Sequence, residues 1–315
     1  MLSHCQHGIG STAAIARGMG EVVPGKTHVV PNALDERILA LAAELERRPV
    51  KTDPRFVTIG YGSGSRTHDG DFGIVASALL AVMQRHPQVR LAIHGPLELP
   101  APFRRFADRV FQIPFLQGDD YLRALASWQI SIAPLEDSLF NEAKSNIKFI
   151  EAAILGVPSI CSGTGPFREA IEHGRTGLIA ETPEEWEAAL TRLVLDAGLR
   201  HGIAQEARRA VLSRYHPRVV ATRQLQQVVE PLLPAPSTRL KVLAVNVLFA
   251  PVSFGGATVV AEQLCRRLQA DGCDVTVFTA ILGSELEPYS VMRYEVDGLP
   301  VIAVQVADDT QRALD

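Results

Sequence analysis

The chain has 315 residues, of which 47% are hydrophobic and 21% charged, and its formal net charge is −4. The length predicts about two domains of ordinary size, and the composition is typical of a globular protein with an ample core. The slightly acidic balance gives no electrostatic reason to expect a nucleic-acid partner.

Cysteine spacing and apolar runs narrow the class of protein further. Cys5, Cys161, Cys265 and Cys273 lie too far apart in sequence for a CxxC metal site, and reduced thiols are expected. The longest apolar run, residues 242–252, is too short to span a bilayer, and the N-terminus lacks the pattern of a signal peptide. We expect a cytoplasmic protein without a transmembrane segment, for which peripheral membrane contact stays open.

The first 34 residues combine a glycine pattern with a proline turn. Gly8, Gly10 and Ala13 spell G-x-G-x-x-A, but a dinucleotide site needs a buried strand before this pattern, and none is expected here. The segment 27–34, THVVPNAL, leads into an expected helix that Asp35 caps and that ends at Arg47. We therefore expect no cofactor loop near the N-terminus.

Strands and helices alternate from residue 56 to residue 133. Strands are expected at residues 56–60, 89–94, 110–113 and 130–133, and helices at residues 71–85, 103–106 and 119–127. Runs rich in β-branched residues and bounded by Pro and Gly suit parallel strands that helices cover on both sides. This alternation predicts a Rossmann-like α/β domain, whose ligands bind beyond the carboxyl ends of the strands.

The loop after the first of these strands, residues 61–68, reads YGSGSRTH. Its small residues would let backbone amides approach an anion, and Arg66 offers a fork of donors to a diphosphate. A plain Gly/Ser turn is the alternative.

The densest functional pattern lies in residues 138–176. Apolar spacing predicts a helix over residues 146–155 that Gly156 ends, then a strand over 157–161, a tight loop over 162–165 and a helix over 166–172. Carboxylates can accept hydrogen bonds from sugar hydroxyls, and ammonium groups can neutralise phosphate. Four such side chains gather around the start of the first helix, although a solvated helix face is the alternative: Glu142, Lys144, Lys148 and Glu151.

The remaining sequence predicts further ordinary elements. Residues 182–185, TPEE, form an expected capping box, and residues 199–214 an amphipathic helix with solvated arginines. After a proline-rich linker, we expect a strand over 241–247, a glycine loop with Gly255 and Gly256, a helix over 258–271 and a strand over 274–279. A hairpin over 294–304 is expected to turn at Asp297 and Gly298.

Residues 138–177 resemble the donor-site core of GT-B glycosyltransferases of the group-1, family-four-like class. In that family a Glu-x7-Glu helix precedes Gly-x-Pro, a strand and a Gly-x-x-Glu turn, and Glu151, Gly156, Pro158, Gly165 and Glu169 stand in this order here. The spacing departs from the family at the first carboxylate, because Glu142 makes the pattern Glu-x8-Glu.

The loop that contains Arg66 resembles the Gly-Arg loop of the same family. The usual later lysine is missing, since His68, Asp69 and Asp71 occupy that area. We therefore expect Lys144 or Lys148 to carry its charge.

The resemblance implies transfer of a sugar from a nucleotide-sugar, which is a substrate and not a cofactor, to a glycan or lipid-linked acceptor in polysaccharide biosynthesis. The resemblance alone implies retention of anomeric configuration. The lack of an Asp-x-Asp pair agrees with a metal-independent site. A non-catalytic nucleotide-sugar-binding module and a sugar-nucleotide epimerase stay open as alternatives.

On this resemblance, Glu151 is expected to hold the ribose hydroxyls and Glu142 the donor sugar. No residue is assigned as a catalytic nucleophile. The expected donor-binding set is Gly64, Arg66, Glu142, Lys144, Ser145, Lys148, Glu151 and Gly165, with Gly255 and Gly256 as a second phosphate loop.

The resemblance also implies an order of domains. Residues 1–34 would be the tail of a GT-B N-terminal domain with its hinge, 35–232 a nucleotide-sugar-binding C-terminal domain, 233–240 a linker, and 241–315 the start of a further, incomplete N-terminal domain. We expect a segment of a tandem enzyme that by itself binds donor weakly and catalyses little. A permuted enzyme, completed by the loop at Gly255, is the alternative.

Overall fold

The computed structural model describes residues 5–64, 69–232, 239–246, 248–251, 256–281 and 287–306. The chain divides into two compact units, Met1–Gln224 and Leu225–Asp315, each with its own hydrophobic core. Most of the expected linker, residues 233–238, lies outside the described residues, and the expected division into domains stays a prediction.

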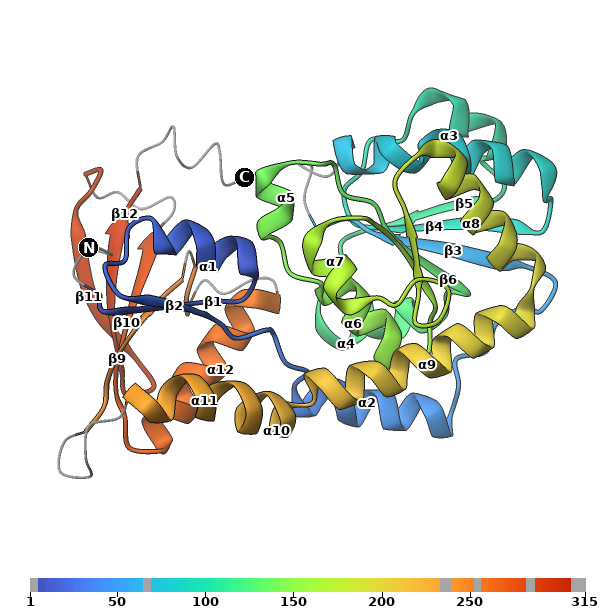
Figure 1. Ribbon diagram of the computed structural model, residues 1–315. Helices are drawn as coiled ribbons and strands as arrows, with labels where there is room; N and C mark the ends of the chain where they lie inside the picture. The colour runs from blue at the N-terminus through green and yellow to red at the C-terminus, as the bar shows by residue number, and fades with distance from the viewer. Residues whose placement is uncertain are drawn as a thin grey trace. The chain divides into compact units, whose positions relative to one another are not determined.

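Six parallel strands form the main sheet of the first unit, in the spatial order β5-β4-β3-β6-β7-β8 (Figure 1). The chain enters the middle of the sheet at β3, builds outward to β5, and returns to the other side of β3 with β6. This reversal makes the gap between β3 and β6 the switch point of a doubly wound sheet, and it confirms the predicted Rossmann-like α/β class. The strands are β3 (Val57–Gly62), β4 (Val89–His94), β5 (Val110–Ile113), β6 (Ile130–Ala133), β7 (Ser159–Ser162) and β8 (Leu178–Ala180).

Helices cover both faces of this sheet (Figure 1). One hydrophobic cluster contains Trp186 and lies under α3 and α8, and another contains Val211 and lies under α6 and α9. The neighbouring residues Ile160 and Cys161 of β7 belong to different clusters, as the alternation of side chains along a strand requires. The helices are α2 (Glu36–Arg47), α3 (Asp69–Arg85), the 3₁₀ helix η3 (Ala101–Phe106), α4 (Gly118–Leu125), α5 (Leu139–Ala143), α6 (Ile147–Ile154), α7 (Gly165–Ala170), α8 (Pro183–Leu195) and α9 (Ala197–Tyr215).

The segment before this domain forms a small βαβ unit, with β1 (His7–Gly10), α1 (Ala13–Gly20) and β2 (Lys26–Val29). The two strands pair in parallel as a separate two-stranded sheet. Gly8 and Gly10 lie within β1 and not in a loop after a strand, so the G-x-G-x-x-A pattern does not form a dinucleotide loop.

Leu34, at the end of the expected hinge, connects the βαβ segment to the end of α9. Leu34 is 1% exposed, and its N–H donates to the carbonyl of Tyr215 at 2.8 Å. Asp35 then caps α2, because its carboxylate accepts from the N–H of Ile38 at 2.6 Å, as predicted.

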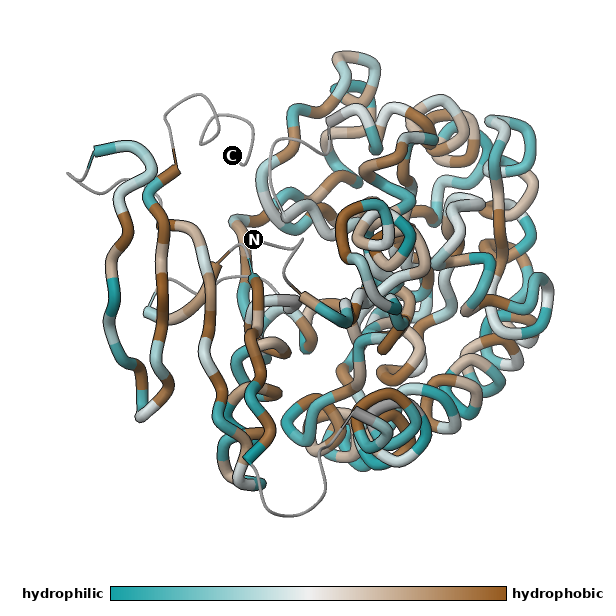
Figure 2. Tube along the Cα trace, turned by 60° about the vertical axis from the view of Figure 1, so that its left-hand side comes forward, coloured by the Kyte–Doolittle hydropathy of each residue, from teal (hydrophilic) through white to brown (hydrophobic). Residues whose placement is uncertain are grey.

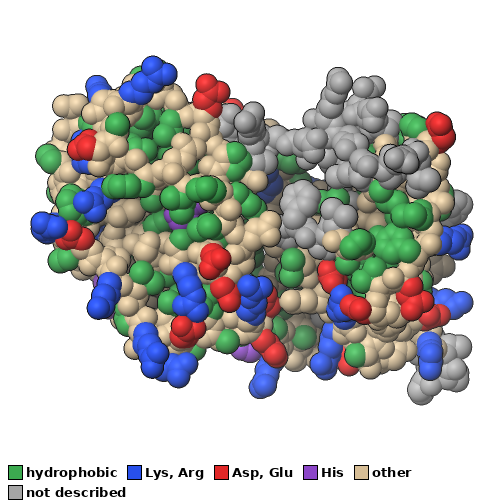
Figure 3. All heavy atoms as spheres, turned by 180° about the vertical axis from the view of Figure 1, so that it is seen from behind, with side chains coloured by type: hydrophobic (Ala, Val, Ile, Leu, Met, Phe, Trp, Pro, Cys, Tyr) green, Lys and Arg blue, Asp and Glu red, His purple; other side chains and the backbone are tan. Residues whose placement is uncertain are grey.

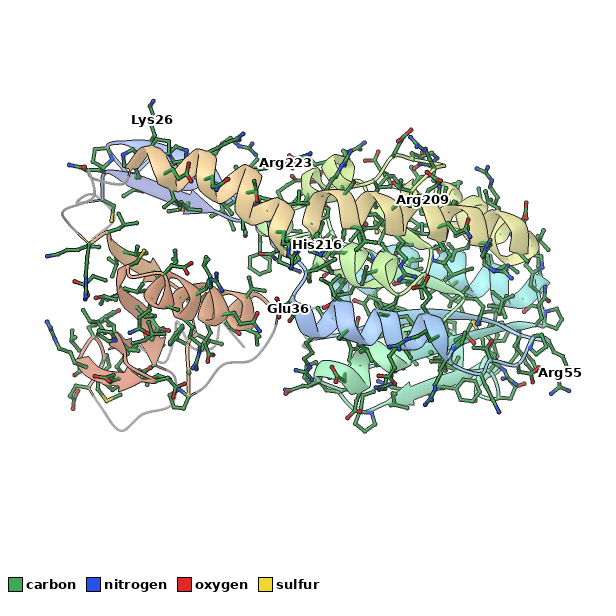
Figure 4. All side chains as sticks on the ribbon, turned by 90° about the horizontal axis from the view of Figure 1, so that it is seen from below. Lys26, Glu36, Arg55, Arg209, His216 and Arg223 are labelled. Atoms are coloured by element: carbon green, nitrogen blue, oxygen red, sulfur yellow. The ribbon has the colours of Figure 1, made fainter. Side chains whose placement is uncertain are left out.

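The chain continues beyond α9 through His216, which caps the short helix α10 (Pro217–Val220), into the π-helical turn η4 (Ala221–Leu225). Figure 4 shows Arg209, His216 and Arg223 following one another along this path. The expectation of solvated arginines in α9 is wrong for Arg200, which is half-buried and donates to the carbonyls of Leu193 and Val194.

Several element bounds follow the sequence closely. β4, β5 and β6 have the predicted bounds, and the capping box of Thr182 and Glu185 is present. β7 begins at Ser159 and not at residue 157. It ends at Ser162 and α7 begins at Gly165, so the tight loop is two residues shorter than predicted. Charged side chains of both signs are interspersed over the first unit (Figure 3), with ion pairs such as Arg123–Glu44 at 3.0 Å.

The second unit contains a four-stranded sheet in the order β11-β12-β10-β9. Three of its strands are parallel, and β11 and β12 form the predicted hairpin, with positive φ at Asp297 (49°) and Gly298 (81°). Hydrophobic residues are frequent along the strands of this sheet (Figure 2), and the buried positions of β12 alternate with more exposed ones. The elements are α11 (Gln226–Val229), the 3₁₀ helix η5 (Glu230–Leu232), β9 (Lys241–Val245), α12 (Gly256–Ala270), β10 (Asp274–Ile281), β11 (Val291–Val296) and β12 (Leu299–Gln305).

Candidate functional site at the switch point of the sheet

The carboxyl ends of β3 and β6 place two loops side by side at the switch point. Ser63 and Gly64 follow β3, and residues 134–138 lead from β6 to α5. The N–H of Leu135 donates to the hydroxyl of Ser162 at 2.8 Å, which joins the end of β7 to the same edge. The sheet therefore gathers three loop ends where ligands of such folds bind.

The loop after β3 packs tightly against the end of β4. The N–H of Ser63 donates to the carbonyl of His94 at 2.7 Å, and the next residue, Gly95, has φ of +107°. A Cβ atom on Gly95 would lie 1.9 Å from the carbonyl oxygen of Ser63. Glycine is required at this position because of both the backbone conformation and the close approach. Gly64 is exposed at the end of the loop, and the predicted anion-binding residue Arg66 lies outside the described residues.

Lys148 on α6 lies at the end of β3. Its ammonium nitrogen donates to the carbonyl of Gly62 at 3.0 Å and lies 5.0 Å from the centre of the Tyr61 ring. Burial, and to a smaller extent the positive charge of Lys144, lower the pKa of Lys148 to about 8. A cation that is costly to bury and that has a cationic neighbour favours a bound anion.

Glu151 lies one helical turn after Lys148 on α6. It stands in the middle of this helix and not at its start, which corrects the sequence-based expectation. Burial raises the pKa of Glu151 to about 7, and the charge of Lys148 opposes this rise. The pKa of Tyr121 is raised by burial and then by the charge of Glu151, so this phenol lies in the same electrostatic cluster.

Lys144 forms an ion pair with Asp71, at 3.4 Å between the ammonium nitrogen and Oδ2. The side chain of Lys144 is 24% exposed, whereas that of Asp71 is 3% exposed. The charges of Lys144, Asp71 and Glu151 all act on Lys148. The structure thus brings together three of the predicted donor residues, Lys144, Lys148 and Glu151, with Asp71 as a fourth member.

Glu142 is held by the start of α7. Its two carboxylate oxygens accept from the N–H of Gly165 at 3.0 and 3.1 Å. Thr164, directly before Gly165, is 4% exposed, and its hydroxyl has no hydrogen-bond partner among the described residues. Glu142 and Gly165 are therefore neighbours, while Ser145 lies in the short connection between α5 and α6.

Sequence reasoning missed several polar groups at this edge: Asp71, Tyr121, Asn141, Thr164 and His94. Burial lowers the pKa of His94, whose Nδ1 has no hydrogen-bond partner among the described residues. Only Asp71 had a signal in the sequence, because it stands where a lysine was expected.

Gly256 begins α12 in the second unit, and Gly255 lies outside the described residues.

A separate cavity of about 370 Å³ lies between the βαβ segment and the helices α6, α7 and α9. It contains none of the predicted donor residues, although it borders Asn146 and Pro166 next to them. Its walls are formed by Ser11, Thr12, Val29, Pro31, Asn146, Pro166, Glu169, Arg214, Tyr215, Val219 and Arg223.

In the described part of the chain, no three His, Cys, Asp or Glu side chains lie close enough together to hold a metal ion. Cys161, Cys265 and Cys273 are free thiols. No helix among the described residues is both long and apolar enough to cross a membrane.

The sequence profile of a family described as glycosyl transferase-like matches residues 67–226. The chain belongs to this glycosyl transferase-like family. The match covers α3, most of the main sheet and both α6 and α7, so it contains the charged cluster at the switch point. No curated protein matches the sequence significantly.

Solved structures show that the fold is the GT-B fold. Sucrose-phosphate synthase from Thermosynechococcus elongatus has a TM-score of 0.52 at 18% identity, over 73% of this chain and 59% of that one. HepE from Anabaena, in complex with UDP and glucose, has a TM-score of 0.55 at 19% identity, over 72% of this chain and 63% of that one. A glycosyltransferase from Rickettsia africae has a TM-score of 0.55 at 15% identity, over 72% and 64%. The chain thus spans about three fifths of the length of these proteins.

Proposed function

We propose that this protein transfers a sugar from a nucleotide-sugar donor to a glycan or lipid-linked acceptor, and that the donor binds at the carboxyl ends of β3 and β6. One observation carries the proposal. The half-buried ammonium of Lys148 lies at the switch point of a GT-B sheet, beside a second cation and a carboxylate of raised pKa.

In this proposal Lys148 and Lys144 neutralise the donor diphosphate, together with Arg66 and the backbone near Gly64. Two ammonium groups next to a buried carboxylate form an electrostatic environment suited to an anion that carries hydroxyl groups. Stabilisation of the leaving diphosphate by fixed cations is a known source of catalysis.

Glu151 would accept hydrogen bonds from the two ribose hydroxyls, since an ionised carboxylate offers several acceptor sites. Glu142 of α5, which the N–H of Gly165 holds at the start of α7, would contact the donor sugar. Complexes of HepE with UDP-glucose and with UDP support a nucleotide-sugar as the donor class. We further propose that the transfer needs no metal ion, because Lys144 and Lys148 supply positive charge for the diphosphate.

The test is turnover with a panel of UDP-, GDP-, ADP- and dTDP-sugars, with and without candidate glycan or lipid-linked acceptors. We expect release of one nucleoside diphosphate, faster when an acceptor is present, and loss of that release in Lys148→Met. The matched control is Lys51→Ala, because Lys51 is exposed and precedes β3 at the opposite edge of the sheet.

The same assay separates the alternatives. A product formed from donor alone, with the nucleotide still attached, would indicate an epimerase. Binding of donor with no product under any condition would indicate a binding module and would contradict the proposal.

A further inference from the structure

Asp71 is a buried carboxylate that contacts the segment between β6 and α6 at three points. It lies in the first turn of α3, and its residue is 2% exposed. Its Oδ1 accepts from the N–H of Glu136 at 2.9 Å and from the side-chain amide of Asn141 at 3.0 Å. Its Oδ2 accepts from the ammonium of Lys144 at 3.4 Å.

All three donors belong to the segment that joins β6 to α6. Asp71 itself belongs to the helix that follows the loop after β3. The carboxylate therefore links the two loops on either side of the switch point. The amide of Asn141 also donates to the carbonyl of Glu136 at 2.9 Å, which fixes the segment internally.

The contact with Asp71 also determines where the charge of Lys144 lies. A lysine ammonium is a point charge on a flexible four-carbon stem, so its position depends on its partner. Asp71 holds this ammonium close enough to Lys148 for its charge to be felt there. The ammonium has three donor hydrogens and keeps part of its surface exposed, so the pair does not exclude a further anionic partner.

We propose that Asp71 is the positioning residue of the donor site: it holds the ammonium of Lys144 beside Lys148, where both face the donor diphosphate. This inference rests on the proposed function. Asp71 is too deeply buried to touch the ligand and acts through Lys144. The chain thus carries an acid at the place where the family pattern leads one to expect a lysine, and that acid holds a lysine from another loop.

A double-mutant cycle with Asp71→Asn and Lys144→Gln tests the assignment. Asparagine keeps an oxygen that can accept from Glu136 and Asn141, but it lacks the charge that attracts Lys144. The affinities for UDP, GDP, ADP, CDP and dTDP are measured by calorimetry on the wild type, and the tightest is then measured on each variant beside its nucleoside without phosphate.

We expect Asp71→Asn to weaken diphosphate binding about tenfold, as for loss of a charge-assisted contact. In the Lys144→Gln background the same change should cost less than about twofold, because the two residues act through one contact. Binding of the nucleoside should be the same in all variants, whereas a general structural defect would weaken it too. If Asp71→Asn does not fold, Lys144→Gln alone must show the selective loss of diphosphate binding.

Three results would overturn the inference. The first is unchanged diphosphate affinity in Asp71→Asn or in Lys144→Gln, and the second is an equal decrease in affinity for the nucleoside. The third is a further decrease of about tenfold when Asp71→Asn is added to Lys144→Gln. Failure of the wild type to bind any of the five diphosphates is a different outcome. It would remove the proposed function and, with it, this role of Asp71.

Discussion

Replacing Glu151 by glutamine tests two properties of this carboxylate. One is the free energy that its charge costs the folded state, and the other is its proposed hydrogen bonding to the donor ribose. Burial raises the pKa of Glu151 from 4.5 to about 7. At about 1.4 kcal/mol for each pH unit, the ionised side chain costs the folded state about 3 kcal/mol. Because Glu151 keeps some solvent exposure, we reduce this figure and expect Glu151→Gln to stabilise the fold by about 1–2 kcal/mol at pH 7.5.

The sign of the pH dependence follows from the two pKa values. The carboxyl ionises near 4.5 in the unfolded chain and near 7 in the folded one, so the folded state binds more protons between these values. The contribution of Glu151 to the free energy of unfolding therefore falls as the pH rises from 4.5 to 7. Glutamine does not titrate, so the variant and the wild type should differ little at pH 4.5 and most at pH 7.5.

The same substitution should weaken binding of the nucleoside diphosphate. Because charged hydrogen bonds to the ribose hydroxyls are lost, the free energy of binding should become less favourable by roughly 1.5–3 kcal/mol. Urea unfolding at pH 4.5 and 7.5 measures the stability, and calorimetry measures the affinity. The control is Glu184→Gln, an exposed glutamate of α8, which should change neither by more than about 0.5 kcal/mol. A Glu151→Gln variant that is less stable than the wild type at pH 7.5, or that binds with unchanged affinity, would refute this reasoning.

Three further predictions follow from the same site and sheet. Diphosphate affinity, measured by calorimetry from pH 6 to pH 9.5, should peak between about pH 7 and pH 8. In the protein without ligand, Glu151 gains a proton below this range and Lys148 loses one above it. An affinity that does not change with pH would contradict both assignments. EDTA should leave diphosphate binding intact, and restoration of lost binding by magnesium or manganese would show that a metal is required. Gly60→Ala should lower the free energy of unfolding by about 2 kcal/mol or more, because its Cβ would lie 1.8 Å from the Trp128 ring. Gly73→Ala, whose Cβ in α3 meets no atom within 4 Å, should be neutral or stabilising, and equal effects of the two changes would be inconsistent with this packing.

The parts of the fold that local sequence determines were predictable. β4, β5 and β6 are short β-branched runs bounded by Pro, Gly or polar residues, and their bounds agree with the prediction. The turn at Asp297 and Gly298 was predictable because a two-residue hairpin needs positive φ at both positions. β7 was placed two residues early, since Val157 is apolar like a strand residue but precedes Ser159, the first residue that pairs with β6.

The sequence offers candidate site residues, but it does not predict the contacts between them. Lys144 and Asp71 are 73 positions apart in sequence, and their ion pair depends on how β3 and β6 meet. The bidentate contact between Glu142 and Gly165 likewise depends on how α5 lies against α7. No periodicity or motif encodes such contacts, because they arise only when distant segments pack together.

The central claim is that the charged cluster at the ends of β3 and β6 binds the nucleotide part of a sugar donor. Calorimetric titration of the wild type, Lys148→Met and the control Lys51→Ala with UDP, GDP, ADP, CDP and dTDP tests it most directly. The account predicts that one of these diphosphates binds the wild type and the control with equal affinity at a single site, and binds Lys148→Met at least about tenfold more weakly. Absence of binding to the wild type, or equal affinity for all three proteins, would contradict it.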